Sequence, residues 1–231
     1  MSASKPIVIA IDGPSGAGKS TASRNTARRL GFIHVDTGAM YRSVTWAVLN
    51  HGVAPDDRAA VTALLPKLSM AMQVHDGSVQ WWINGQYPEQ EIRSPRTEAA
   101  VSAVSAIPEV REWCVARQRE SVQLGNVVME GRDIGTVVFP QTPYKFFLMA
   151  SPEVRAQRRQ KDLEALQHKQ SVDQVVQNLI ERDRKDSSRA HSPLKKADDA
   201  RVIDTSHNTV EQTASEILKA LREMGAIKRE T

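Results

Sequence analysis

The stretch 6-PIVIAIDGPSGAGKST-21 joins a short apolar run to a glycine-rich loop. The spacing of Gly13, Gly18, Lys19 and Ser20 fits the pattern G-x-x-x-x-G-K-[ST], between a predicted strand and a predicted helix. Glycines let backbone N–H groups turn inward around a phosphate, and the positive end of the following helix adds to the attraction. The loop therefore predicts a nucleotide phosphate site in which Lys19 reaches the transferred phosphoryl group. The predicted nucleotide contacts are Gly13, Pro14, Ser15, Gly16, Ala17, Gly18, Lys19, Ser20 and Thr21.

Composition limits the classes of partner. The chain has 231 residues, enough for one sizeable core, and 31 basic residues against 27 acidic ones give a net charge of +4. This balance suits small anionic ligands, whereas a nucleic-acid partner needs a concentrated basic stripe with stacking aromatic residues. No apolar stretch reaches the roughly 18 residues of a membrane-spanning helix. We therefore expect a cytoplasmic monomer with no nucleic-acid or membrane partner.

Cysteine and histidine usage gives no metal centre. Cys114 is the only cysteine, so neither an intrachain disulfide nor a cysteine-based metal site can form, and we expect a buried thiol. The six histidines show no metal-ligand spacing and no nucleophile to activate.

Short apolar runs alternate with helical patterns along the chain. The first helix is predicted at 19–30 and ends at Gly31, and capping signals at Ser151, Ser171 and Thr209 open later helices. The apolar runs are mostly unalternating, as is typical of parallel strands buried on both faces, and lie at 6–11, 32–35, 127–129, 144–149 and 201–203. We therefore predict an α/β fold of the P-loop NTPase class, with a five-stranded parallel sheet covered by helices.

One segment departs from this alternation. The runs 68–74 and 78–85 predict two antiparallel strands joined by a turn that contains glycine. We expect residues 64–95 to form a small antiparallel insert within a single domain of residues 1–231.

Two arginine-rich segments lie further along the chain. The polar segment 153–170 predicts a helical lid that closes over the nucleotide and excludes water. In 182-RDRKDSSR-189, a continuing helix would place two arginines and Asp186 on one face. Phosphoryl transfer is accelerated chiefly by positioning and positive charge, so these segments supply candidate catalytic groups. The candidates are Arg158, Arg159, Arg182 and Arg189.

A second anion site is predicted beside the loop. In 36-DTGAMYR-42, Thr37 opens a helix toward the crevice, and Tyr41 and Arg42 lie about one turn further on. The Arg42 guanidinium can grip an incoming monophosphate through two hydrogen bonds.

Charged residues also follow the third predicted parallel strand. In 130-EGRDIGTVVFP-140, Glu130, Arg132 and Asp133 lie at the carboxyl end of that strand, where ligands bind in open α/β sheets. The Ser20 hydroxyl is suited to bind Mg²⁺ directly, and Glu130 is a candidate to orient a water bound to that ion.

Taken together, IDGPSGAGKST, DTGAMYR, EGRDIGTVVFP and ERDRKDSSR resemble bacterial-type cytidylate kinase in their order and spacing. That family transfers the γ-phosphoryl group of ATP to CMP or dCMP, and its bacterial branch carries an antiparallel insert near the monophosphate site. The resemblance assigns residues to three parts of the acceptor and to the transferred group. It implies that Thr37, Tyr41 and Arg42 act at the CMP phosphate, with Arg132 nearby, and that Ser102, Arg111 and Asp133 contact cytosine. It also implies that Arg182 and Asp186 contact the sugar and that Arg189 faces the transferred phosphoryl group.

Two alternatives stay open at this point. The same chemistry could act on UMP or AMP, because the phosphate loop and the candidate arginines do not identify the base of the acceptor. A nucleotide-dependent switch is the alternative from another class, although the chain lacks the Asn-Lys-x-Asp and Asp-x-x-Gly elements of GTP switches.

Overall fold

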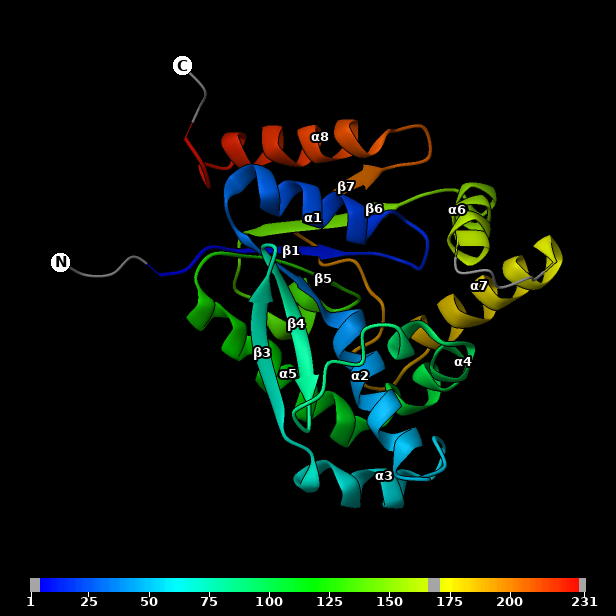
Figure 1. Cartoon of the computed structure of the whole chain (residues 1–231). Coiled ribbons are helices and arrows are strands. Elements are labelled where there is room, and N and C mark those ends of the chain that lie inside the picture. The colour runs from blue at the N-terminus through cyan, green and yellow to red at the C-terminus, as the bar shows by residue number, and fades with distance from the viewer. Residues whose placement is uncertain (1–4, 166–170, 229–231) are drawn as a thin grey trace.

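The computed structural model describes residues 5–165 and 171–228. Within these residues the chain forms one mixed sheet of seven strands (Figure 1). Their order across the sheet is β3 (Met70–His75), β4 (Ser78–Ile83), β2 (Ile33–Asp36), β5 (Val127–Gly131), β1 (Val8–Asp12), β6 (Tyr144–Met149) and β7 (Arg201–Asp204).

Six of these strands run parallel: β4, which pairs with β2, and the five strands β2, β5, β1, β6 and β7. The last five coincide with the five predicted apolar runs, so the predicted parallel sheet is confirmed. Side chains of β1 alternate between two cores: Val8 and Ala10 belong to one, Ile9 and Ile11 to the other. Burial on both faces explains why the run shows no polar alternation.

Helices cover both faces of the parallel sheet (Figure 1). On one face lie α1 (Lys19–Leu30) and α8 (Val210–Glu223), which pack on each other. The other face is covered by α2 (Thr37–Asn50) and α5 (Pro108–Glu120), where Cys114 is fully buried as predicted, and α4 (Pro95–Val104) packs on α2. The remaining elements are α3 (Arg58–Leu64), α6 (Pro152–Ala165), α7 (Val172–Ser187), the 3₁₀ turns η1 (Leu65–Lys67), η2 (Glu91–Arg93) and η3 (Ser121–Leu124), and the π turn η4 (Ile134–Val138).

The predicted capping residues are confirmed at the end of α1 and at the starts of α7 and α8. Gly31 ends α1 with φ 65°, a left-handed conformation that glycine adopts readily. Ser171 and Thr209 each form a complete capping box at the start of α7 and α8. None of the described helices has the length and apolar character needed to cross a membrane.

The predicted hairpin forms from β3 and β4, and it extends the parallel sheet at the edge strand β2. The Trp81 ring is buried in the core, and its Nε1–H donates to the Asp36 carbonyl oxygen at 2.9 Å. The hairpin is thus attached to the sheet beside the start of α2. The predicted lid, 153–170, corresponds to α6, and its last five residues lie outside the described part of the chain.

Candidate active site

The phosphate loop lies between β1 and α1, as predicted. Gly13 has φ 148°, and a Cβ there would collide with the Leu148 carbonyl oxygen, so only glycine fits. Gly18, with φ 79°, turns the chain into α1. The Lys19 Nζ donates to the Pro14 carbonyl oxygen at 2.7 Å, so the ammonium lies across its own loop.

The electrostatic environment of Lys19 favours loss of its proton. Burial is the main cause, and the positive charge of Arg132 adds to it; together they lower the pKa of Lys19 to about 7, against the opposing influence of Glu130 and Asp12. An anionic ligand beside the ammonium would restore the charged form.

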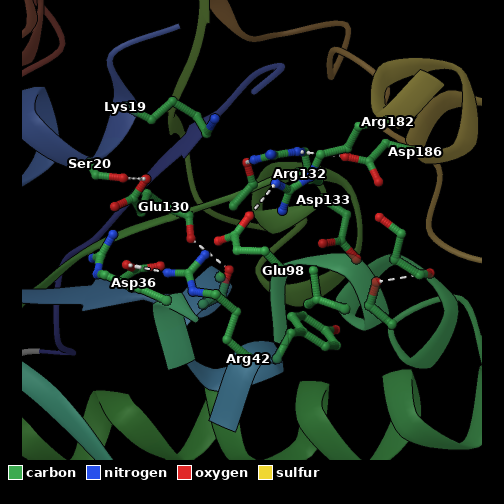
Figure 2. A pocket seen from close by; sticks show the side chains of 18 of the residues that line it. Lys19, Ser20, Asp36, Arg42, Glu98, Glu130, Arg132, Asp133, Arg182 and Asp186 are labelled. Carbon is green, nitrogen blue, oxygen red and sulfur yellow. Dashed lines mark hydrogen bonds and ion pairs between the residues drawn. The ribbon is translucent and has the colours of Figure 1, made fainter. Parts of the chain in front are cut away.

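The acid predicted at the end of β5 faces the loop. The Ser20 hydroxyl donates to the Glu130 Oε2 at 2.9 Å, as Figure 2 shows. The Thr37 hydroxyl donates to the Glu130 carbonyl oxygen at 2.7 Å and is buried. Thr37 therefore connects the start of α2 to β5, and it also lines the cavity of about 500 Å³ that is described below.

Asp36 and Arg42 form an ion pair at the start of α2 (Figure 2). The Asp36 Oδ1 caps the helix by accepting from the Ala39 N–H at 2.8 Å, and Oδ2 lies 3.3 Å from the Arg42 Nη2. Burial pushes the pKa of Asp36 upward, but the Arg42 charge and the Ala39 N–H outweigh it and leave that pKa lowered. Arg42 is thereby held at the pocket wall.

Arg111 and Asp133 meet at the opposite end of the pocket. The Arg111 Nη2 lies 2.7 Å from the Asp133 Oδ2, and its Nη1 donates to the Ser105 carbonyl oxygen at 3.1 Å. The guanidinium also stacks 5.0 Å from the centre of the Tyr41 ring. Ser102, predicted beside this pair, lines the same pocket from α4.

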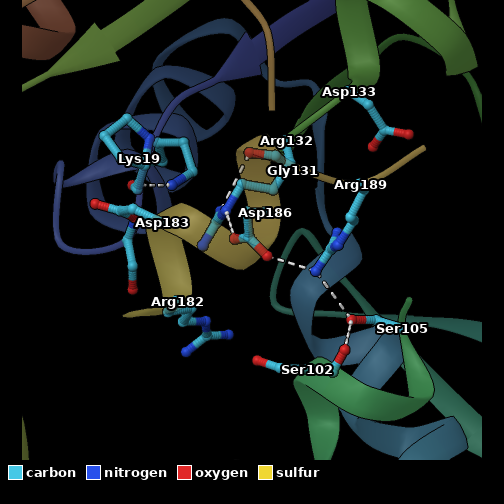
Figure 3. A network of polar contacts seen from close by, with 12 residues as sticks. Lys19, Ser102, Ser105, Gly131, Arg132, Asp133, Arg182, Asp183, Asp186 and Arg189 are labelled. Carbon is cyan, nitrogen blue, oxygen red and sulfur yellow. Dashed lines mark hydrogen bonds and ion pairs between the residues drawn. The ribbon is translucent and has the colours of Figure 1, made fainter. Parts of the chain in front are cut away.

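Asp186 joins two of the predicted arginines (Figure 3). Its Oδ2 accepts from the Arg132 Nε at 2.9 Å, and its Oδ1 accepts from the Arg189 Nη2. The Arg189 Nη2 also donates to the Ser105 hydroxyl at 3.2 Å. Because α7 ends at Ser187, Arg189 lies beyond the helix and reaches back to Asp186, so the three predicted residues do not all lie on one helix face. They nevertheless line one pocket.

Glu98 pairs with two further arginines, of which Figure 2 labels Arg182. Its Oε2 lies 2.9 Å from the Arg159 Nη2 and 3.5 Å from the Arg182 Nη1. Burial, together with the charge of Arg132, lowers the pKa of Arg182 to about 10. One carboxylate on α4 thus pairs with guanidiniums from both α6 and α7.

These residues surround one cavity of about 500 Å³. It extends from the phosphate loop to the Arg111–Asp133 pair. The predicted residues that line it are Lys19, Ser20, Thr21, Thr37, Tyr41, Arg42, Ser102, Arg111, Glu130, Arg132, Asp133, Arg159, Arg182, Asp186 and Arg189.

A second cavity, of about 580 Å³, shares Lys19, Ser20 and Thr21 with the first. The Arg158 guanidinium donates to the Thr205 hydroxyl at 2.9 Å and to the Thr205 carbonyl oxygen at 2.6 Å. Asn208 lies on the same wall. The adjacent arginines of α6 therefore separate: Arg158 lines this cavity, and Arg159 lines the first. Of the predicted loop residues, this second cavity is lined by Gly16, Gly18, Lys19, Ser20 and Thr21.

The remaining loop residues make contacts within the protein. The Asp183 Oδ1 accepts from the Ser15 N–H at 3.3 Å, and Arg155 binds both the Ser15 carbonyl oxygen, at 3.1 Å, and Asp183. The Ala17 carbonyl oxygen accepts from the Thr205 hydroxyl at 3.1 Å. Through these bonds α6, α7 and the residue that follows β7 contact the phosphate loop directly.

Asp12, which precedes the phosphate loop, binds the turn that follows Asp133. Its two carboxylate oxygens accept from the Ile134 and Gly135 N–H groups, each at 2.8 Å. Burial raises the pKa of Asp12 to about 6, although these two N–H groups lower it. Asp12 thus fixes the backbone that follows Asp133.

Among the site residues that sequence reasoning missed are Asp12, Glu98, Ser105 and Asp183. Glu98 and Asp183 are single acidic residues in helical segments, where a solvated side chain is the ordinary expectation. For Asp12, one available signal was its place beside the loop at the end of a buried strand. No local pattern distinguishes Ser105.

The chain resembles known proteins along most of its length. The family model for cytidylate kinase matches residues 9–223. The cytidylate kinase of Geobacter sulfurreducens is 43% identical over 217 residues, covering 94% of this chain and 93% of that protein. That of Corynebacterium glutamicum is 47% identical over 213 residues, covering 92% and 93%. Among solved structures, an uncharacterized protein from Eubacterium ventriosum has a similar fold, with a TM-score of 0.54 at 10% identity over 95% of this chain and 99% of that one. The chain belongs to the cytidylate kinase family.

Proposed function

We propose that this protein transfers the γ-phosphoryl group of ATP to the 5′-phosphate of CMP or dCMP, giving ADP and CDP or dCDP. The observation that carries the proposal is the cavity of about 500 Å³ with Lys19 at one end and the Arg111–Asp133 pair at the other. A monophosphate that binds its base at the pair would direct its phosphate toward the loop.

Arginine charge would stabilise the transferred group. Lys19, Arg182 and Arg189 are the candidates to spread the charge that develops in the transition state, while Arg42 and Arg132 bind the acceptor phosphate. The protein needs no general base, because the acceptor phosphate is already anionic near neutral pH. Positioning and charge are therefore the main contributions of the chain.

Cytosine fits the polar groups at the far end. It offers an exocyclic amine donor and a ring-nitrogen acceptor, which match the Asp133 carboxylate and the Arg111 guanidinium. The Arg111 guanidinium lines the cavity and carries more N–H donors than the two that bind the Ser105 carbonyl oxygen and Asp133. Ser102 supplies a hydroxyl on the same wall.

The same groups discriminate against uracil. Uracil carries a carbonyl where cytosine has its amine, so UMP would place an acceptor against the Asp133 carboxylate. A site that leaves a buried polar group unpaired rejects a substrate strongly. Adenine shares the donor and acceptor pattern of cytosine and would have to be rejected by the size of its double ring, which keeps AMP as the more serious alternative.

Magnesium fits the residues at the loop. Mg²⁺ prefers oxygen ligands and is commonly held by one or two protein oxygens together with substrate phosphates. The Ser20 hydroxyl and the Glu130 carboxylate provide oxygens 2.9 Å apart beside Lys19. In this proposal Ser20 holds the ion directly and Glu130 holds it through a bound water. When bound, the ion neutralises charge on the transferred phosphoryl group.

The cavity lined by Arg158 and Asn208 is the proposed ATP side. Within a single domain, 153–170 would act as the lid that excludes water, and 64–95 would act as the insert beside the monophosphate site. We also propose a cytoplasmic monomer, and light scattering of the purified protein tests the monomeric state.

An ADP-release assay with ATP, Mg²⁺ and each of CMP, dCMP, UMP and AMP tests the function. We expect CMP and dCMP to stimulate ADP release, and Lys19→Met to abolish the stimulation. If no monophosphate raises ADP release above the background without acceptor, the kinase proposal is wrong. If AMP or UMP is preferred, only the assigned acceptor is wrong.

A further inference from the structure

His34 is a buried histidine that contacts both the hairpin and the acid at the end of β5. It lies in β2 and is 1% exposed. Its Nδ1 lies 3.3 Å from the Ser78 hydroxyl on β4, and its Nε2 lies 3.3 Å from the Glu130 Oε1 on β5. The imidazole therefore bridges two strands that do not pair with each other in the sheet.

The backbone of His34 also carries the attachment of the hairpin. Its N–H donates to the Gly77 carbonyl oxygen at 2.8 Å. Within 5–165 and 171–228, β4 pairs with β2 at one position, His34 with Ser78. His34 is thus one residue of β2 that binds the hairpin, and Asp36 is another, through Trp81.

Glu130 has a different partner on each carboxylate oxygen. Oε1 faces the His34 ring, and Oε2 accepts from the Ser20 hydroxyl in the phosphate loop. The terminal torsion of a glutamate is broad, so its carboxylate plane is set by such partners. Groups that hold a metal-facing carboxylate typically change metal affinity about 10–100-fold when they are removed.

We propose that His34 is a positioning residue, which holds the Glu130 carboxylate toward Ser20 and thereby strengthens magnesium-dependent nucleotide binding. The inference rests on the proposed function, since it takes the Ser20–Glu130 side as the magnesium side. With its proton on Nε2, the ring donates to Glu130 and accepts from the Ser78 hydroxyl, and the Ser23 Oγ lies 3.5 Å from the same Nε2.

Two substitutions separate the contacts of the ring. The glutamine amide reaches about as far as Nε2, so His34→Gln keeps a donor for Glu130 and loses the group facing Ser78. The asparagine amide reaches about as far as Nδ1, so His34→Asn keeps the Ser78 side and loses the donor to Glu130. Both introduce an amide at the same buried position, which matches them as a pair.

Calorimetric binding of adenylyl imidodiphosphate, with magnesium and with EDTA, tests the inference. We expect magnesium to tighten nucleotide binding to the wild type. This gain, the ratio of the affinity with magnesium to the affinity with EDTA, should be about 10-fold smaller in His34→Asn but within about 3-fold of the wild-type gain in His34→Gln. CMP binding should stay within about 2-fold of wild type in both. Equal gains in the two variants, or a wild type whose binding does not respond to magnesium, would overturn the inference.

A third variant keeps the test decisive if substitution of the buried ring prevents folding. Ser78→Ala leaves the donor to Glu130 and removes the hydroxyl that holds Nδ1, so the gain from magnesium should fall about 3-fold, less than expected for His34→Asn. An unchanged gain in Ser78→Ala contradicts the role of the hairpin contact. The ADP-release assay on wild type is independent of these results, so failure of the proposed function is recognised separately.

Discussion

The Arg111 guanidinium and the Asp133 carboxylate form a buried ion pair, with Nη2 2.7 Å from Oδ2 and each residue 3% exposed. A buried pair is costly to break, because removal of one charge leaves the other without compensation. Its place at one end of the pocket links acceptor recognition to stability.

Asp133→Asn should impair the acceptor and spare the donor. The amide presents a donor to the cytosine amine, so we expect kcat/KM for CMP to fall roughly 100-fold or more while the KM for ATP stays within about 3-fold. The lost charge should also lower the free energy of unfolding by about 3–5 kcal/mol. Steady-state kinetics and urea unfolding measure the two effects.

Asp199→Asn is the matched control for this substitution. Asp199 pairs with Lys145 at 2.8 Å but is largely exposed and lies outside the pocket. Its loss should leave the kinetics for CMP unchanged. Equal losses for CMP and ATP in Asp133→Asn would remove Asp133 from base recognition.

Lys19 should take up a proton when a triphosphate binds. Its pKa in the free protein is about 7, against a usual 10.5, and a bound polyphosphate raises it again. At pH 9 we therefore expect uptake of roughly one proton per ATP, measured by calorimetry in buffers of different ionisation enthalpy. Lys19→Met should abolish the uptake, and an unchanged uptake in that variant contradicts the assignment.

The same shift fixes the sign of a stability effect. Between pH 7 and 10.5 the unfolded chain carries the Lys19 proton and the folded chain does not. Because the unfolded state binds more protons in this window, the contribution of Lys19 to the free energy of unfolding rises with pH. Lys19→Met should lack that rise.

Much of the fold could be predicted because its signals are local. The loop from Gly13 to Thr21 carries its glycines, lysine and hydroxyl in one stretch. The consecutive apolar residues of β1 likewise indicate a strand that is buried on both faces. The hairpin was also found from its turn and flanking runs. That β4 joins β2 could not be predicted, because the pairing rests on one residue of β2, which is His34.

The missed site residues act through distant partners. Glu98 meets Arg159 across 61 positions, and Ser15 meets Asp183 across 168. Such pairs are brought together by the order of strands in the sheet. A local sequence pattern cannot predict them, because their members are far apart in the chain. The family resemblance assigned roles to residues that match the family's motifs. Glu98 and Asp183 were not among them.

Glu98→Gln should destabilise the protein in a pH-dependent way. Burial would raise the pKa of Glu98, but Arg182 and Arg159 outweigh it and hold that pKa below its usual 4.5. The stabilising contribution is therefore present above pH 4.5 and is lost as pH falls through the folded-state pKa. We expect a loss of roughly 1–2 kcal/mol at pH 7 that shrinks toward pH 4, measured by thermal melting at both values.

Glu181→Gln serves as the control for Glu98→Gln. Glu181 pairs with Arg184 and Lys185 on an exposed face of α7, where solvent screens the interaction. Its loss should change stability little at pH 7. A destabilisation equal to that of Glu98→Gln would show that burial of the Glu98 cluster has no special weight.

Arg158→Ala and Arg159→Ala should affect different substrates, although the two residues are adjacent in α6. Arg158 binds Thr205 beside the proposed ATP cavity, whereas Arg159 pairs with Glu98 in the acceptor pocket. We expect Arg158→Ala to raise the KM for ATP about 10-fold with little change for CMP, since one charge-assisted contact is typically worth about 1.5–3 kcal/mol. Arg159→Ala should instead lower kcat and kcat/KM for CMP. Each variant is the control for the other, because both remove one arginine from the same helix; the same kinetic change in both would show that the two cavities do not divide the substrates as proposed.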